Sequence, residues 1–596
     1  MTAAVAAVRV RAERLRVAVS ADVLALGSLA AFSLGLLGLV WGTWGDLDSD
    51  TGYDLVAGIR IVDGDLPYRD FDYFYGPLAP GISALAVLFG GSGLGSAVAL
   101  GLLVAAAVVL ATYALARTML EPVGAALAAA LTAAVALIPN NYSFVVPHTH
   151  AATLGTLALL GMLLCVWRYA SSEQARWLLA AGASIGLIAL TKPEPLVAAA
   201  FGAGLWLVLR GLSGARFRRE AALLLAPALA IPAVVYGALA ASVGMHRLVF
   251  ENLYPVDFLD AAGNAMIKNR MPMTVSSFAE VGGKLALYAA GCAGLVFVAS
   301  RIAKGGRLAT MLIAACAFGG FVFVVGSLVK PDGLRDGMYY LYGWIPAGAV
   351  VALALLVRRY HRRAGAWAAV RQVELTTVAV LAVLALTTYA SFVVHGWRPQ
   401  MAVYYIPFAA VLLARLHLVE LPRNRAGYVL GVLWIAFLVG AAAGLTLKDA
   451  RAESATVRGP GGAIAETPAE ARAYQSALDV IAARTKPGDP ILVAPLMTGL
   501  YPLADRTSPL SEISLLPGAL PTVADERAAI ARLERAGVSL VITDNREWPG
   551  YGHTSFGGSF DQELARWVKG NFNHAATIRT SGEDRALDVW LKRRVP

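Results

Sequence analysis

About thirteen apolar runs fill the first 450 residues, and they limit what this chain can fold into more than any other feature. Each run is close to the roughly 20 residues that a helix needs to cross a bilayer. Backbone groups in lipid must be hydrogen-bonded within the protein, and a helix achieves this within one segment. The runs cover 21–40, 95–118, 121–139, 150–170, 175–191, 194–211, 219–242, 283–302, 307–329, 340–357, 373–395, 401–418 and 425–446. The sequence therefore predicts an α-helical polytopic membrane protein, with about 13 transmembrane helices in a domain over residues 1–450.

The composition excludes several classes of protein. Hydrophobic residues make up 58% and charged residues 15% of the chain, against about 45–50% and about 25% in soluble domains. All three cysteines fall inside apolar runs, which excludes a disulfide framework and a cysteine-based metal site. The formal charge of +10 does not indicate a nucleic-acid partner, because residues 451–596 hold 17 basic and 17 acidic side chains. The excess of cations belongs to the membrane part.

These cations predict the orientation of the chain. Four arginines precede the first apolar run, which has no small-residue cleavage site, so we expect a retained span that enters from the cytoplasm. The joins that would then be cytoplasmic are basic, as the positive-inside rule requires. They contain Arg216, Arg218 and Arg219; Arg301, Lys304 and Arg307; Arg358, Arg359, Arg362, Arg363 and Arg371; and Arg423 and Arg425. An odd number of spans places residues 451–596 outside a cytoplasmic (inner) membrane, on the face opposite the N-terminus.

An acidic segment, residues 46–80, follows the first span and forms the first outer loop. It carries eight aspartates: Asp46, Asp48, Asp50, Asp54, Asp63, Asp65, Asp70 and Asp72. Ionisable groups at a membrane face are costly, so such a cluster indicates a functional site. The spacing of apolar residues predicts a short amphipathic helix over 52–62, with Thr51 and Asp54 as a capping box. Asp50 then has no predicted structural role, and it is therefore the candidate general base.

Other interpretations of this loop stay open or fail on the sequence. The aspartates before the helix could form only a solvated loop. A calcium loop is excluded, because glycine stands at Gly52 and position twelve is Ala57 instead of glutamate. The aromatic residues over 68–75 suit a sugar-stacking surface and an interfacial belt equally well.

The other outer joins supply cations and polar groups. Lys192 and Glu194 interrupt an apolar hairpin, and residues 140–150 bring His148 and His150. The remaining candidate cations are Lys268, Arg270, Arg335 and Arg398. A lysine at a helix end commonly extends to the interface without any chemical role. The two histidines lack a third ligand, so no metal site is predicted.

Residues 451–596 read as a small extracytoplasmic α/β domain. We expect a linker at 459–462; helices over 467–484, 524–536 and 561–569; strands over 490–495 and 538–543; and a hairpin of 575–580 with 586–591. About 145 residues suffice for one hydrophobic core. No glycine-rich phosphate loop appears at a strand-to-helix turn, so a nucleotide-binding module is not predicted. A lid or acceptor-binding role and plain structural support both stay open.

The first outer loop resembles that of the GT-C glycosyltransferases, in the branch with protein O-mannosyltransferases and the aminoarabinose transferase of lipid A. The matching residues are Asp50, Gly52, Tyr53, Ala57, Gly64, Pro67-Tyr68-Arg69-Asp70-Phe71 and Tyr75-Gly76-Pro77-Leu78. The number of spans, the outward C-terminal domain and the Lys192–Glu194 hairpin are similar too. This chain departs from the family at Thr51, where many members carry glutamate; Asp48 or Asp54 could supply the second carboxylate.

The resemblance implies inverting transfer of a sugar from a polyprenyl-phosphate donor to an envelope glycan, lipid or protein, with Asp50 in the family's acidic position. The residue types also suit this reaction independently of the resemblance, since a carboxylate must take the acceptor's proton and cations must stabilise the departing phosphate. The candidate catalytic residues are Asp50, Asp48 and Asp54; the phosphate-binding ones are Lys192, Lys268, Arg270, Arg335 and Arg398; the substrate-binding ones are Tyr53, Arg69, Tyr75, His148 and Glu194. The need for a divalent metal stays open.

A transporter or flippase of lipid-linked sugars is the competing hypothesis, with the acids as a gate. Such a protein should show inverted repeats and polar breaks within its spans. The sequence has no internal repeat, and its ionisable residues lie almost wholly at span ends. A structural or sensory membrane protein is a third, weaker alternative.

Overall fold

The computed structural model describes most of the chain. The described residues are 2–45, 50–139, 143–212, 217–270, 358, 373–394, 403–420, 422, 424–579 and 585–593. The predicted spans 283–302, 307–329 and 340–357 lie outside them, as do Asp48, Arg335 and Arg398. Asp50 and Arg270 are described for their backbone only.

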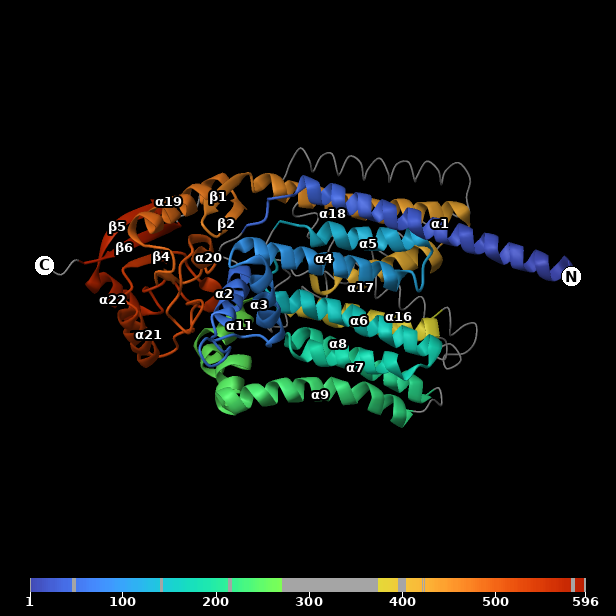
Figure 1. Cartoon of the computed structure of the whole chain (residues 1–596), viewed down its shortest axis with the longest axis horizontal. Coiled ribbons are helices and arrows are strands. Elements are labelled where there is room, and N and C mark those ends of the chain that lie inside the picture. Colours follow the sequence, from blue (N-terminus) through green and yellow to red (C-terminus); the bar gives the residue numbers. More distant parts are fainter. Residues whose placement is uncertain are drawn as a thin grey trace.

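Long apolar helices run side by side through most of the molecule (Figure 1). Within the described residues, six have the length and composition to cross a membrane. They belong to α1 (Thr2–Leu39), α4 (Leu94–Ala116), α6 (His150–Ser172), α8 (Pro193–Leu212), α9 (Phe217–Val243) and α18 (Arg425–Ala452). The other helices at predicted spans are α5 (Pro122–Ala136), α7 (Ala175–Ala189), α16 (Val373–Val394) and α17 (Ile406–Arg415). α17 begins five residues later than the predicted run at 401–418.

The alanine-rich helix α5 lies at the centre of one group of helices. Its sequence, PVGAALAAALTAAVA, is buried over nearly its whole length. It packs against α1, α4, α17 and α18. Small side chains allow this close approach, which is the main source of helix association in lipid. The hydroxyl of Thr446 on α18 donates a hydrogen bond to the Ala134 carbonyl of α5 at 2.7 Å.

Short helices gather at one end of the bundle, opposite the N-terminus (Figure 1). They are α2 (Asp50–Val62), α3 (Leu78–Gly90), α10 (Val256–Phe258), α11 (Asn264–Arg270) and α20 (Leu500–Ala504). Two π-helical turns, Arg247–Leu253 and Leu259–Gly263, connect α9 to α11, and a third, Leu416–Glu420, follows α17. The acidic loop and the C-terminal part therefore lie at the same end of the molecule.

The predicted linker at 459–462 is wrong. β1 (Ala455–Gly459) and β2 (Gly462–Glu466) pair antiparallel, and the glycine-rich stretch is their turn. This turn is packed, since the Leu94 N–H donates to the Gly461 carbonyl at 3.1 Å. A Cβ on Gly93 would lie 2.4 Å from the same oxygen. The turn therefore lies directly on the first residues of α4.

A four-stranded sheet in the order β3-β4-β6-β5 follows, with β3 (Leu492–Ala494) and β4 (Leu540–Asp544) parallel. The predicted terminal hairpin is present as β5 (Phe572–Arg579) and β6 (Ala586–Lys592). The predicted helices appear as α19 (Pro468–Arg484), α21 (Val523–Arg535) and α22 (Gln562–Asn571). Thr467 caps α19, and Thr522 with Asp525 forms a capping box on α21.

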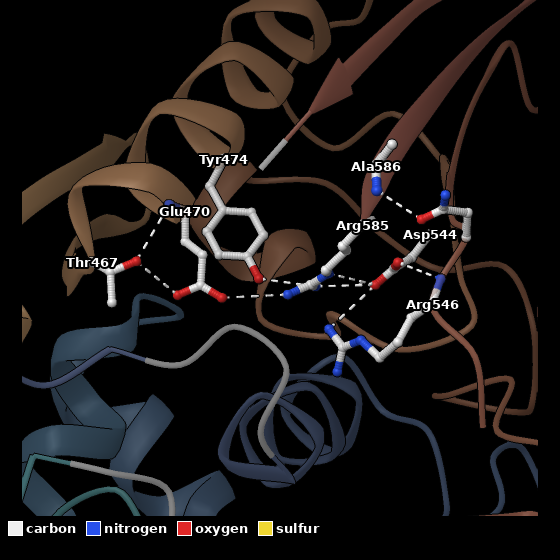
Figure 2. Close-up of polar contacts among 8 residues, drawn as sticks. Thr467, Glu470, Tyr474, Asp544, Arg546, Arg585 and Ala586 are labelled. Carbon is white, nitrogen blue, oxygen red and sulfur yellow. Dashed lines mark hydrogen bonds and ion pairs between the residues drawn. The ribbon is translucent and has the colours of Figure 1, made fainter. Parts of the chain in front are cut away.

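A buried polar network joins α19 to the sheet (Figure 2). The Arg585 guanidinium lies 3.0 Å from the Asp544 carboxylate and donates to the Tyr474 hydroxyl at 3.1 Å. Arg546 contacts the same carboxylate at 3.2 Å. Because Asp544 is only 1% exposed, both arginines stabilise a charge that would be costly alone.

Candidate functional site

Helix α2 places the acidic loop against the start of α6. The helix begins at Asp50, so Thr51 lies in its first turn and is not the cap. The Thr51 hydroxyl donates instead to the Pro147 carbonyl at 2.5 Å. The predicted capping box is therefore wrong, because both of its side chains turn toward the segment before α6. The predicted end of the helix is confirmed at Val62, with Gly64 at φ +102°.

The Asp54 carboxylate is fully buried at this contact. It accepts hydrogen bonds from the Tyr73 hydroxyl at 2.5 Å and from the His150 N–H at 2.5 Å. The Thr149 hydroxyl donates to it at 3.1 Å, and His150 Nδ1 lies 3.2 Å away. His150 is the first residue of α6, where the helix dipole favours a negative charge. These contacts join α2, the aromatic loop and α6.

Lys192 lies at the centre of a second cluster, immediately before α8. Its ammonium nitrogen is 4.5 Å from the centre of the Tyr75 ring and 3.2 Å from the Tyr404 hydroxyl. His148 Nε2 lies 3.4 Å from the same nitrogen and 3.2 Å from the Tyr75 hydroxyl. Glu194 is 3.8 Å away. The structure thus brings together four predicted site residues, Lys192, Tyr75, His148 and Glu194.

The two clusters are adjacent. Thr51 contacts Pro147, and the residue after Pro147 is His148, which belongs to the lysine cluster. Asp54 contacts His150, two residues further along. The first turn of α2, which carries Asp50, therefore lies against the segment that reaches Lys192. This arrangement can hold an anion near the lysine, beside the segment that contacts the first turn of α2.

A row of aromatic rings leads away from Lys192. Tyr75 meets Tyr73 edge to face at 5.8 Å between ring centres, and Tyr73 stacks on Tyr53 at 5.3 Å. Tyr53 stacks in turn on Phe74 at 6.5 Å. Burial and the neighbouring Asp54 raise the pKa of Tyr73 well above its usual value, so this hydroxyl stays protonated and donates. The Tyr53 hydroxyl donates to the Asp72 carbonyl at 2.8 Å.

The structure does not bring the remaining described candidates to Lys192. The Arg69 side chain is 51% exposed and pairs with its neighbour Asp70 at 2.7 Å. This bond lowers the pKa of Asp70 to about 2, helped by the Leu66 N–H. Lys268 is exposed on α11. Among the described residues, no three His, Cys, Asp or Glu side chains are grouped to hold a metal ion.

Four residues of these clusters were not among the predicted site residues. Tyr404 lies 212 positions from Lys192 in the sequence, and only its place beside Tyr405 at the start of an apolar helix could have drawn attention to it. Tyr73 was part of the noted aromatic run, and His150 part of the noted polar join. Thr149 gave no signal before the fold placed it on Asp54.

Comparison with known proteins gives one family and several distant structures. Residues 76–236 match the sequence model of the dolichyl-phosphate-mannose-protein mannosyltransferase family. No curated protein matches the chain. The archaeal oligosaccharyltransferase AglB from Archaeoglobus fulgidus, solved with an inhibitory peptide and a dolichol-phosphate, is 15% identical with a TM-score of 0.45, over 92% of this chain and 72% of that one.

ArnT from Cupriavidus metallidurans bound to undecaprenyl phosphate is also 15% identical with a TM-score of 0.45, over 94% of this chain and 98% of that one. Its apo structure is 13% identical with a TM-score of 0.38, over 95% and 98% of the two chains. These are likenesses only, and the family match covers residues 76–236. That match agrees with the resemblance drawn from residues 50–78: over residues 76–236 the chain is similar to a family of membrane glycosyltransferases that use a dolichyl-phosphate donor, the polyprenyl-phosphate-dependent class that the sequence predicted.

Proposed function

We propose that this enzyme moves a sugar from a polyprenyl-phosphate donor to an acceptor outside the cytoplasmic membrane, with inversion at the anomeric carbon and Asp50 as general base. One observation carries the proposal. The first turn of α2 contacts Pro147, and the next residue, His148, contacts Lys192. These contacts bring the backbone of the helical turn that carries Asp50 next to the segment that reaches Lys192, and this supports the proposal. The family match at 76–236 supports a lipid-phosphate donor.

In this reaction Lys192 binds the donor phosphate and Asp50 receives the acceptor's hydroxyl proton. The acceptor oxygen attacks the anomeric carbon from the face opposite the phosphate, and the bond from that carbon to the phosphate oxygen breaks. The electron pair leaves with the phosphate, whose charge the ammonium group stabilises. A phosphate is a good leaving group, so one carboxylate suffices.

The remaining candidates take lesser roles in the proposal. Tyr75, His148 and Glu194 position Lys192, and Asp54 holds α2 against α6. Arg335 and Arg398 stay predicted phosphate ligands. The N-terminus is cytoplasmic, and residues 451–596 form an extracytoplasmic domain. The acceptor is an envelope glycan, lipid or protein.

Asp50→Asn tests the proposal. Asparagine keeps the shape of the side chain but cannot accept a proton at neutral pH, and loss of a general base costs about 10²–10⁴ in rate. The donor is first identified by mass spectrometry as the lipid-linked sugar that accumulates in cells lacking the enzyme. Transfer by purified full-length variants in detergent is then measured beside donor binding. Asp63→Asn, on an exposed residue of the same loop, is the control. Near-normal transfer by Asp50→Asn, with donor bound, would refute the assignment.

A further inference from the structure

A cavity of about 660 Å³ lies where three parts of the chain meet. Its walls come from α2 with the loop that follows, from the π-helical turn Arg247–Leu253 with α10, and from α21 with the segment that precedes it. We call it the junction cavity and define it by Tyr53, Asp72, Phe74, Phe258, Glu512 and Arg532 of its lining. Its volume falls within the range of about 300–1,000 Å³ of small-molecule sites.

Hydrogen bonds across the walls hold the cavity open. The Asp72 N–H donates to the Ser511 carbonyl at 3.0 Å, and the Tyr73 N–H donates to Asn252 Oδ1 at 2.9 Å. Arg60 of α2 donates to the Leu510 carbonyl at 2.6 Å. Each of these bonds joins two of the three parts of the chain, so the cavity is formed before any ligand binds.

The junction cavity is separate from the Lys192 cluster. Tyr73 is fully buried between them, stacked on Tyr53 of the cavity wall and in edge contact with Tyr75 of the lysine cluster. A group bound in the cavity therefore does not contact Lys192. Lys192, the cation proposed to bind the lipid phosphate, lies on the other side of the Tyr73 ring.

The lining selects against anions. It carries five carboxylates and two guanidinium groups among the described residues, and each arginine already has a glutamate partner. Arg532 donates two bonds to Glu512 at 2.7 and 2.8 Å, and Arg247 lies 3.5 Å from Glu251. The Asp72 carboxylate, by contrast, accepts no hydrogen bond from the described residues, so it can accept one from a ligand.

The rings and the carboxylates together suit a sugar. Phe74 and Phe258 stack at 5.3 Å between ring centres, and both are half-buried in the wall. A pyranose ring presents a flat face of C–H groups to such rings and a rim of hydroxyl donors to carboxylates. A lipid tail would leave the carboxylates unsatisfied, at the cost of burying unpaired polar groups.

We infer that the junction cavity binds non-anionic carbohydrate of the acceptor, neutral or amine-bearing, away from the reacting hydroxyl. This inference rests on the proposed transferase function and makes the acceptor a glycan. Asp72 and Glu512 accept hydrogen bonds from the sugar, and Phe258 packs on its C–H face.

Binding of short sugars to the full-length protein in detergent, without donor, tests the inference. The probes are mannotriose and maltotriose as neutral ligands, chitosan trisaccharide as the amine-bearing one and mannose 6-phosphate as the anion. We expect at least one trisaccharide to bind and to bind about tenfold more weakly to Phe258→Ala. Asp72→Asn, which preserves shape, should weaken chitosan trisaccharide most. Tyr254→Ala is the matched control, because this ring is 61% exposed and lies outside the cavity lining.

The inference is overturned if no trisaccharide binds, if mannose 6-phosphate is preferred, or if both cavity variants bind as the wild type does. None of these results bears on the transfer reaction, because donor and Lys192 do not enter the measurement. Conversely, normal transfer by Asp50→Asn would defeat the proposed function while trisaccharide binding could persist.

Discussion

Lys192 packs on the face of Tyr75, with its ammonium nitrogen 4.5 Å from the ring centre. The lysine directly precedes α8, and the tyrosine ends the aromatic run of the first outer loop. The ring fixes the ammonium group at the end of the bundle that carries α2, and the aromatic face stabilises the cation in addition to the Glu194 carboxylate 3.8 Å away.

Lys192→Ala should raise the KM for the lipid-phosphate donor about tenfold to a hundredfold, because a charged hydrogen bond contributes about 1.5–3 kcal/mol. Steady-state kinetics with varied donor measure this effect. Lys486→Ala is the comparison, since this exposed lysine lies in the C-terminal part and is not a candidate phosphate ligand. An equal rise in both variants would mean that the donor site is elsewhere.

Asp54→Asn should reduce stability more than it reduces the rate of correctly folded enzyme. Its carboxylate accepts from Tyr73, Thr149 and the His150 N–H, and the amide NH2 of asparagine would face a donor. Each lost bond to a charged group costs about 1.5–3 kcal/mol. Thermal unfolding in detergent measures this loss. A variant with unchanged Tm and no activity would instead make Asp54 a catalytic residue.

Gly52→Ala should weaken the contact between α2 and the C-terminal part. A Cβ at this position would lie 2.4 Å from the Gly499 nitrogen, a backbone atom that cannot move alone. We expect a lower Tm and faster proteolysis of residues 453–593. Gly81→Ala is the control, because its Cβ would meet nothing within 4 Å, and alanine favours the helix. Equal behaviour of the two variants would contradict the tight contact.

Asp72 should make stability depend on pH. Burial, and then the facing Glu512, raise its pKa to about 6; Glu251 adds to this and Arg247 and Arg532 oppose it. The folded state therefore binds the proton more tightly than the unfolded state. This contribution is fully present below about pH 4 and is lost as the pH rises to about 6.

The measurement is the difference in Tm between the wild type and Asp72→Asn across this range. The wild type should lose stability relative to the variant as the pH rises, and the difference should become constant above about pH 7. Parallel Tm curves would show that folding does not shift the pKa of Asp72.

Topology is tested with single cysteines in a chain whose three native cysteines are replaced. Lys486→Cys should react with an impermeant thiol reagent on intact cells, and Arg218→Cys should react only after lysis. Both positions are exposed, whereas a side chain at Gly459 would meet the Leu503 carbonyl at 2.2 Å. The reverse labelling pattern would place the site on the cytoplasmic face.

The sequence predicted local elements well and contacts poorly. Hydropathy located α4, α6, α8, α9 and α18 within a few residues, because lipid imposes both length and composition. It could not show that Thr51 bonds to Pro147, since capping is the local alternative and the competing partner lies 96 residues away. The turn at 459–462 was mistaken for a linker because glycine and proline mark flexible and packed turns alike.

For the candidate site residues too, the sequence indicated single residues but not the contacts between them. Lys192 and Tyr75 could be named as candidates because an isolated charge and an aromatic run are visible in the sequence, but nothing there joins them to Tyr404. The structural role of Asp54, as distinct from the role proposed for Asp50, could be recognised only from the fold. Both residues lie near the start of α2, and the contact of Asp54 with α6 is visible only in the fold.

The close approach of Gly93 to the β1–β2 turn, with that of Gly52 to Gly499, has a practical consequence for protein engineering. At both places backbone meets backbone with no room for a methyl group. The C-terminal part is therefore not an interchangeable module. A chimera that joins it to the bundle of a related enzyme would need glycine at both positions of the recipient, however well its hydrophobic residues matched.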